Sequence, residues 1–485
     1  MITIQGLCAI APEIILAVFA AVVLLVGAFF PRCSNRLHIL ANSGVLCAII
    51  ALIMVVNTAD FTHPLYFFNH TIVLDRLAVF LKLFLMIGAM VVLTYAHTYN
   101  TDRRIPATEF LSLFLLATVG MLLLVSAHSM MMTFLAVELL SLPSYALVAL
   151  WRQPCHCAEA ALKYFIMGAL ATCMLLYGFS LLFGVVRHLD FTHIHNVLQL
   201  ASMHSMIALV ALVFILAGLG FKLGVAPFHP WVPDVYAGAP TSVATFIATL
   251  PKCAVFAMLV RLMLDSFSGM SADWQPLLVI IAILSMAIGN IAAIVQTKIK
   301  RLFAYSSIAH GGYALLGIIS HTKDGYAASL FYIVTYVVTN LAAFGVLCAC
   351  AMPGEELDTM DDLKGLGVRS PKRAWVLLMT MFSLMGVPPL VGFIAKLGLL
   401  EALIEQGWVM LAVAAIIFSI IGSYYYLRVV RLMYFEQGEG GNTMLVTAFS
   451  PLQSSLLFCN GVMVLLLGIF PGYLFAYCHA VFDAF

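Results

Sequence analysis

The chain has 485 residues, of which 64% are hydrophobic and only 9% charged, and its formal net charge is +1. Its mean hydropathy of +1.08 excludes an ordinary water-soluble domain, in which about 25% of residues are charged. The balanced charge and the lack of a polybasic run exclude a basic nucleic-acid-binding surface. We therefore expect a protein that crosses a membrane many times and has no nucleic acid among its partners.

The first thirty residues form an apolar run that we interpret as the first membrane span. No lysine or arginine precedes this run and Glu13 interrupts its beginning, which is unlike a secretory signal peptide. Crossing the hydrocarbon takes about 20 apolar residues. The sequence predicts an all-α polytopic fold of about fourteen spans, which lie near residues 7–30, 38–57, 73–97, 108–126, 129–150, 160–186, 206–247, 250–268, 275–296, 300–320, 326–350, 372–405, 407–434 and 451–476.

The seventh and twelfth predicted spans are too long for simple helices and contain helix breakers. Pro227, Pro230 and Pro233 interrupt the seventh, and Pro388 and Pro389 interrupt the twelfth. Proline removes a backbone donor and clashes with the preceding turn. Non-helical backbone at membrane depth persists only where protein or a water-filled cavity satisfies its polar groups. Both spans are therefore predicted to be discontinuous helices that mark the working site.

The distribution of lysine and arginine between the loops predicts the orientation of the chain, because cytoplasmic loops are enriched in both. Alternate loops contain Arg32, Arg36, Arg103, Arg104, Arg152, Lys298, Lys300, Arg301, Lys364, Arg369, Lys372, Arg373, Arg428 and Arg431. The opposite side has little beyond Arg187, Arg261 and Lys323. We expect an even number of spans in a bacterial inner membrane, with both termini periplasmic.

The order of the spans suggests two repeats. The fourth to eighth and the ninth to thirteenth spans each contain five crossings with the broken one fourth, and an odd number of crossings makes such repeats inverted. Residue-level similarity is too faint to prove this, so coincidence stays an alternative. The expected organisation is an N-terminal three-helix region (1–107), a first repeat (108–268), a second, inverted repeat (269–435) and a C-terminal helix (436–485).

At least five ionisable residues lie deep inside predicted spans, and those of interest are Glu138, Lys163, Lys222, Lys252 and Lys396. Each costs about 2.5–3.5 kcal/mol at mid-membrane on insertion scales, so they must face one another, water or polar backbone. Lys222 and Lys396 lie beside the breaks, which favours a functional role. Lys163 and Lys252 could instead be residues that snorkel from helix ends, and Glu138 could form a structural ion pair.

Buried lysine suits proton transfer, because burial disfavours the charged ammonium and a nearby carboxylate favours it. Moving the carboxylate then switches the proton on and off. His310, one helical turn after Ser306 and Ser307, and His229, within the first break, are candidate relays, although each could be a structural hydrogen-bond partner. Loop positions are expected for His128, His156, His188, His193, His195 and His204.

The eleven cysteines follow no disulfide framework. Cys155 and Cys157 flank His156, and Cys348 and Cys350 form a second pair, but neither group has the spacing of a metal site. No phosphate loop, dinucleotide fingerprint, nucleophile elbow or iron-sulfur cysteine array is present. We expect no metal or redox cofactor on this chain.

Several long motifs resemble one known family. They are AVELLSLPSYALV around Glu138, GFKLGVAPFHPWVPDVYAGAPTSV from Gly220, IKRLFAYSSIAHGGY up to His310 and GVPPLVGFIAK ending at Lys396. In this order, and over nearly the whole chain, they are similar to the antiporter-like membrane subunits of respiratory complex I, the proton-pumping NADH:quinone oxidoreductase. That family has fourteen spans, inverted five-helix repeats and broken seventh and twelfth helices, as expected above.

The resemblance implies roles for individual residues. Glu138 and Lys222 match the family's ion pair, which a sixth-helix lysine, here Lys163, influences. Lys252 matches the central relay on the eighth helix, and His310 matches a relay on the tenth.

Lys396 matches the terminal lysine of the twelfth helix, near the exit. Subunit M typically has glutamate there, and we expect this chain to lack the C-terminal lateral helix of subunit L, so it is most similar to subunit N.

By resemblance, the chain is a non-redox, proton-translocating subunit of a translocase. Its partners are other membrane subunits of complex I and the lipid bilayer, and partner subunits bind NADH and quinone. Sequence alone separates this function poorly from that of an Mrp-type cation/proton antiporter or a membrane-bound hydrogenase subunit. A purely structural scaffold is a further alternative.

Overall fold

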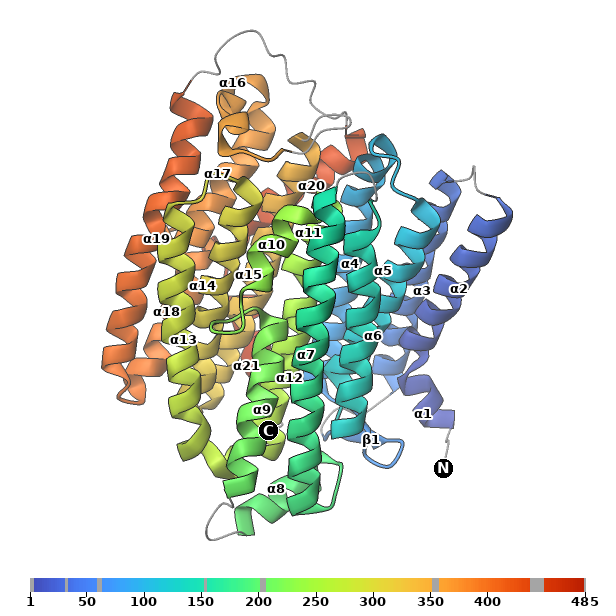
Figure 1. Ribbon diagram of the computed structural model, residues 1–485, viewed down its shortest axis with the longest axis vertical. Coiled ribbons are helices and arrows are strands. Elements are labelled where there is room, and N and C mark those ends of the chain that lie inside the picture. Colours follow the sequence, from blue (N-terminus) through green and yellow to red (C-terminus); the bar gives the residue numbers. More distant parts are fainter. Residues whose placement is uncertain are drawn as a thin grey trace.

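The computed structural model describes residues 4–30, 34–58, 63–151, 155–200, 206–350, 357–436 and 449–483. Within these residues, thirteen helical segments are long and apolar enough to cross a membrane. Figure 1 shows them side by side, with their connections at the two ends. They are formed by α2 (Ala11–Phe29), α3 (Ser34–Thr58), α4 (Arg76–Asp102), α5 (Ala107–Ser126), α6 (Met130–Ala149), α7 (Cys155–Val186), α9 (Met206–Leu223), α11 with α12 (Thr241–Ala248, Leu250–Arg261), α13 (Ser271–Ile294), α14 (Ile299–Ser320), α15 (Lys323–Cys350), α19 (Val409–Phe435) and α20 (Pro451–Ile469).

The one remaining crossing among the described residues is the twelfth in chain order, which the sequence predicted to be a broken helix. It consists of α17 (Pro371–Met385) and α18 (Val391–Glu405), each too short to span the hydrocarbon alone. The other predicted break lies between α9 and α10 (Trp231–Gly238). Both breaks begin with a glycine in the left-handed region, Gly224 at φ +73° and Gly386 at φ +90°, where residues with a Cβ are strained. The prediction of about fourteen crossings with two discontinuous helices is confirmed.

The eighth crossing begins earlier than residue 250, its predicted start. The broken crossing ends with α10, and α11 opens the next one directly after Pro240. This crossing is itself interrupted at Thr249, just before Pro251, and it ends in a π-helical turn at Leu262–Ser266. Lys252 therefore lies in the middle of a crossing rather than near its start. Residues 241–250 contain no charged residue to mark this boundary, so hydropathy alone did not reveal it.

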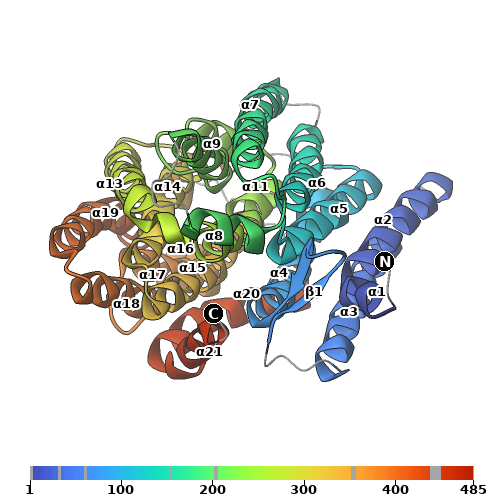
Figure 2. The same ribbon diagram turned by 90° about the horizontal axis from the view of Figure 1, so that it is seen from below.

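The crossings divide into buried and lipid-facing ones. The most apolar stretches of the eighth and eleventh crossings are 94% buried, whereas those of α3 and α20 are 28% buried. Viewed along the helices, α2 and α3 form one edge and α13, α18 and α19 the other, with α11, α14 and α15 between them (Figure 2). Helices that are apolar all round are expected in the interior, and this interior contains Lys252 of the eighth crossing and His310 of α14.

Short elements cover the two ends of the bundle. Strand β1 (Leu65–Phe67) pairs antiparallel with β2 (Ile72–Leu74), Tyr66 lying opposite Val73. The others are α1 (Ile4–Ala9), α8 (Phe191–Leu200), η2 (Ser268–Met270), η3 (Met360–Leu363), α16 (Leu366–Arg369) and α21 (Gly472–Phe482). The hairpin and α8 lie at the end of the bundle near the N-terminus, and α16 lies at the opposite end (Figure 1).

Some predicted positions differ from the structure or fall outside it. His156 lies on α7, and His193 and His195 lie on α8, rather than in loops, because α7 begins before residue 160, its predicted start, and α8 is a helix too short to register as a span. Arg32, Arg152 and His204 lie outside the described residues, as does the side chain of Cys155.

Two buried ion pairs that the sequence did not reveal connect α4 to its neighbours. Lys82 lies 2.6 Å from Glu13 of α2. Asp75 caps α4 and receives two hydrogen bonds of 2.9 Å each from Arg261, at the end of the eighth crossing. Asp75 is 3% exposed and Arg261 is 1% exposed. A bidentate pair of this kind fixes geometry as well as charge, so it ties the N-terminal helices to the centre of the bundle.

We expect Asp75→Asn to destabilise the chain by about 3–5 kcal/mol, because it removes the bidentate partner of the buried Arg261 and leaves only the more distant Asp265 carboxylate, at 3.7 Å. Thermal unfolding of the purified protein in detergent measures the effect. Asp324→Asn is the matched control, since Asp324 is largely exposed and pairs with His479 only at the surface; it is expected to cost less than about 1 kcal/mol. Equal losses in the two variants would contradict the prediction.

Candidate functional site

Lys222 lies at the end of α9, one residue before the first break, and is buried. Its ammonium donates to Ser141 Oγ at 2.6 Å and to Tyr145 Oη at 3.0 Å, both on α6. Glu138 is half-buried on the same face of α6, since residues three and seven positions apart align on a helix. Among the ion pairs of the described residues, none joins Glu138 to Lys222 directly. The hydroxyls of α6 occupy the contact that the resemblance assigned to the carboxylate.

Lys252 lies in the interior beyond the first break. It is 3% exposed and donates to Ser307 of α14, so it does not snorkel to the surface. Its Nζ also lies 5.7 Å from the centre of the Tyr236 ring and packs against Gly224, where an added methyl would lie 3.5 Å away. An added methyl at Gly224 would clash instead with Val232 Cγ2, at 2.7 Å, so the glycine permits the close approach of Val232 to the break.

His310 is buried on α14, one turn beyond Ser306 and Ser307 as the sequence predicted. Its Nδ1 lies 2.5 Å from Tyr332 Oη, and its Nε2 lies 3.0 Å from Tyr426 Oη. Tyr426 Oη also lies 2.5 Å from Ser306 Oγ. Both imidazole nitrogens have hydroxyl partners, which can donate or accept, so the ring can exchange a proton in either direction.

Lys396 lies on α18, in the second half of the broken twelfth crossing. It donates to the backbone carbonyls of Leu384 at 3.1 Å and Met385 at 2.9 Å, and to Ser419 Oγ at 2.9 Å. These carbonyls are free because α17 ends at Met385, and the last carbonyls of a helix have no partner within it. The break therefore provides acceptors for the ammonium.

Lys396 and His310 line the same small cavity, together with Tyr332, Tyr336 and Ser383. Its volume is about 20 Å³, which is enough for about one water molecule. On its other side, Lys396 lines a larger cavity of about 160 Å³ between α14, α18 and α19. Lys396 thus lies between the polar interior and a cavity near the rim of the bundle.

Lys163 and His229 are apart from these contacts. The Lys163 side chain is 44% exposed and binds Glu159 at 2.8 Å and Asp234 of α10 at 2.9 Å, which agrees with its alternative interpretation as a snorkelling residue. Asp234 also pairs with Arg301 at 2.7 Å, so it anchors α10 between α7 and α14. His229 is half-buried in the first break, and its Nδ1 is buried without a hydrogen-bond partner among the described residues.

The sequence interpretation missed the tyrosines. Tyr332 and Tyr426 contact His310 directly, and Tyr145 contacts Lys222. Tyrosine inside an apolar span usually has a hydrogen-bond partner, and its repetition in FYIVTY and SYYY was a usable signal. Cys348 and Cys350, considered as a possible metal-binding pair, are buried free thiols; the other cysteine group includes Cys155, whose side chain lies outside the described residues.

Together, these contacts form a series that we call the polar file: Lys222, Lys252, His310 and Lys396 with their hydroxyl partners. The fold and the polar file define a polytopic membrane protein of the ion-transporting, antiporter-like class. Ionisable groups inside a bundle of membrane helices are the usual mark of such pathways.

Comparisons with known proteins agree with this class. Residues 127–422 match the family described as NADH:quinone oxidoreductase/Mrp antiporter, TM. The chain is 45% identical to NADH-quinone oxidoreductase subunit N of Coxiella burnetii, covering 97% of this chain and 98% of that one. It is 41% identical to the subunit N of Nitrosomonas europaea, covering 95% and 94%. The chain therefore belongs to the NADH:quinone oxidoreductase/Mrp antiporter family and, within it, to the NADH-quinone oxidoreductase subunit N proteins.

Solved structures show the same fold. A chain of respiratory complex I from Thermus thermophilus with bound aureothin superposes with a TM-score of 0.79 at 32% identity, covering 96% of this chain and 98% of that one. A chain of the Mrp complex from Dietzia superposes with a TM-score of 0.84 at 19% identity, covering 99% and 97%. The second similarity concerns the fold alone. The family resemblance predicted from the motifs is confirmed, and the roles of individual residues stay predictions.

We expect Tyr426→Phe to slow proton transfer about tenfold or more, because it removes the hydroxyl that bridges Ser306 and His310. Proton flux in vesicles containing the assembled complex measures the effect. Tyr425→Phe is the matched control, since Tyr425 is equally buried on α19 but donates to Asn290, at 3.1 Å. Both variants lose about 1 kcal/mol of stability. Similar flux in both would contradict a relay through Tyr426.

We also expect Gly386→Ala to slow proton flux, because the added methyl would lie 3.2 Å from Lys396 Cδ and displace the ammonium. The variant also strains the left-handed backbone by about 1–2 kcal/mol. Gly407→Ala separates the two effects, since Gly407 has φ +78° and nothing within 4 Å of its added methyl. Flux that is equally reduced in both variants would attribute the loss to backbone strain and contradict the displacement of Lys396.

Proposed function

We propose that this chain translocates protons across a bacterial inner membrane as subunit N of NADH:quinone oxidoreductase, through the polar file. The observation that supports this most strongly is the file itself: three lysines and a histidine, each bonded to hydroxyls or free carbonyls, crossing an interior made of apolar helices. A purely structural scaffold would not need lysines inside the membrane, since each ionisable group costs about 2.5–3.5 kcal/mol at mid-membrane.

Loading begins at Lys222. Its two partners, Ser141 and Tyr145, lie on the same face of α6 as Glu138, so a small movement of the Glu138 side chain exchanges a hydroxyl contact for a carboxylate contact. A carboxylate favours the charged ammonium and its withdrawal favours release of the proton. Electron transfer from NADH to quinone, in partner subunits, would drive that movement.

Transfer then runs across the bundle by short steps. Lys252 exchanges a proton with Ser307, and hydroxyls of Ser306, Tyr426 and Tyr332 extend the route to His310. A water in the cavity shared by His310 and Lys396 would complete it. Lys396, beside the larger cavity, is the proposed exit.

In this proposal Lys163 and His229 act at the margin of the polar file. Asp234 links Lys163 to α10, which directly follows the first break, so Lys163 would influence the Glu138 and Lys222 pair through the position of α10. His229, with one unpartnered ring nitrogen in the break, would relay protons from water towards Lys222.

We further propose that the bundle end with α16 faces the cytoplasm, which places both termini in the periplasm. The organisation into residues 1–107, 108–268, 269–435 and 436–485 is retained as part of this proposal. Neighbouring membrane subunits of complex I are the partners, and NADH, flavin and quinone bind to other chains, so this chain needs no cofactor of its own.

Lys222→Met is expected to lower the proton flux through this chain at least tenfold, because a positioned acid-base group contributes about 10²–10⁴-fold to proton transfer. The ratio of protons pumped to electrons transferred, measured in intact vesicles with NADH, should fall. Lys298→Met is the matched control, since Lys298 forms an exposed pair with Asp358 and should leave the ratio unchanged. An unchanged ratio in Lys222→Met would overturn the assignment.

A further inference from the structure

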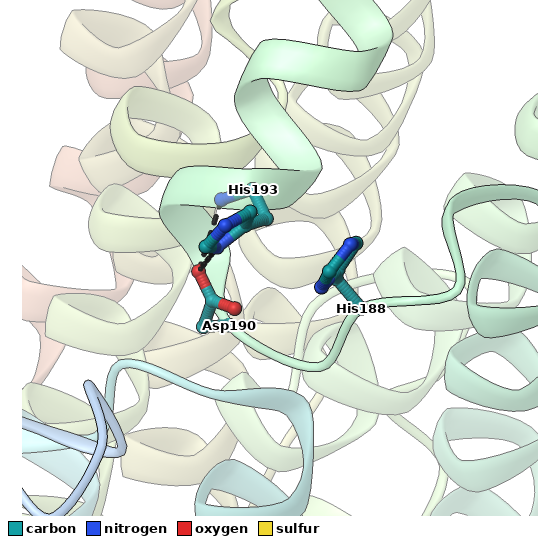
Figure 3. Close-up of side chains that lie close together, drawn as sticks. All are labelled: His188, Asp190 and His193. Atoms are coloured by element: carbon teal, nitrogen blue, oxygen red, sulfur yellow. Dashed lines mark hydrogen bonds and ion pairs between the residues drawn. The ribbon is translucent and has the colours of Figure 1, made fainter.

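Outside the polar file, one group of side chains in the described structure has the composition of a metal site. His188, Asp190 and His193 lie where α7 ends and α8 begins, and each offers a ligand atom within 4.8 Å of the others. Figure 3 shows both imidazole rings and the carboxylate gathered at the first turn of α8. They lie at the bundle end opposite α16 (Figure 1).

Asp190 is the fixed member of the group. Its Oδ1 accepts hydrogen bonds from the His193 backbone N–H at 3.0 Å and from the His193 ring at Nδ1, at 2.6 Å. Partial burial raises the pKa of Asp190, but the hydrogen bonds and the His193 charge outweigh this and hold the pKa below its usual value. The carboxylate is therefore an anion at neutral pH.

His188 is brought to the group by the turn before it. Arg187 has a left-handed backbone, φ +60°, and the chain turns so that the His188 ring stacks on that of His193, with centroids 4.5 Å apart and planes at 16°. Capping α8 requires only Asp190 and the His193 N–H. The position of His188 is therefore unexplained by capping.

The backbone beneath these residues is already anchored to α6. Met130 N–H donates to the backbone carbonyl of Leu189 at 2.9 Å, and Phe191 N–H donates to the backbone carbonyl of His128, just before α6, at 3.2 Å. The His128 ring, in turn, lies 3.0 Å from Thr192 Oγ1. Binding an ion would thus require only side-chain rotations, and little ordering of the chain would oppose it.

We propose that His188, Asp190 and His193 bind one Zn²⁺ ion. Two imidazoles and a carboxylate are borderline ligands that suit Zn²⁺, and three protein ligands leave a fourth position for water. Tetrahedral coordination at about 2.1 Å needs ligand atoms about 3.4 Å apart, which the exposed rings reach by turning. His193 would bind through Nδ1, its hydrogen moving to Nε2.

The test uses the assembled complex, purified with a tag free of histidine and washed with chelator. Zn²⁺ is then titrated in competition with a chromophoric indicator. We expect the parent to bind one more Zn²⁺ than His188→Ala, or to bind that ion at least about tenfold more tightly, since even outer partners of a metal ligand contribute 10–100-fold. His188→Ala leaves Asp190 and its cap intact, so the fold is retained.

His195→Ala is the matched control, because His195 lies on the same helix but its ring bonds Ser268 Oγ at 2.9 Å; it should bind Zn²⁺ as the parent does. Cu²⁺ substituted into the parent should give an electron paramagnetic resonance spectrum with two coupled nitrogens, and His193→Ala should reduce this to one. Identical Zn²⁺ titrations of the parent and His188→Ala would overturn the proposal, as would loss of binding in His195→Ala alone.

Discussion

An ammonium group has three donor hydrogens and no acceptor, and the bilayer provides no water to satisfy them. This constraint accounts for much of the structure around the lysines. Lys396 meets it with two backbone carbonyls and a serine hydroxyl. The carbonyls are free only because α17 stops at Met385, so the broken helix and the buried lysine explain each other. An intact helix would use those carbonyls in its own hydrogen bonds.

Near the first break, the ammonium group of Lys222 has a different kind of acceptor. Lys222 still lies within α9, where the carbonyls are engaged, and its partners are hydroxyls that α6 provides. Lys252 lies beside this break, with its Nζ 3.5 Å from the position of a Cβ at Gly224, although the atom that excludes a side chain there is Val232 Cγ2, at 2.7 Å. Both breaks share the sequence Gly-Val-X-Pro, at 224–227 and 386–389, and both place a left-handed glycine against a lysine. This local correspondence supports the two-repeat interpretation, which sequence similarity alone left open.

The sequence predicted the elements that depend on local chemistry. The number of spans follows from the hydropathy of the sequence, and the two breaks follow from its prolines. The same patterns predicted that Lys222, Lys252 and His310 are buried. It could not predict what depends on tertiary register. Arg261 looked like a loop residue because its partner Asp75 is 186 positions away, and the partners Lys163 and Asp234 are likewise 71 positions apart. The start of the eighth crossing was predicted wrongly for another reason, because residues 241–250 contain no charged residue that would mark the end of one span and the start of the next.

The composition of the polar file constrains how it can operate. It contains three lysines and a histidine, and among the described residues none of the four forms an ion pair with a carboxylate, so full protonation would place several like charges in a low-dielectric interior. A proton arriving on one lysine therefore disfavours a proton on the next. Hydroxyl groups between them provide contacts without adding charge, and tyrosine and serine can donate and accept in turn. In the proposed route, charge would therefore move by displacement from one lysine to the next, and Glu138, on the face of α6 that contacts Lys222, is the group that we propose to set the direction.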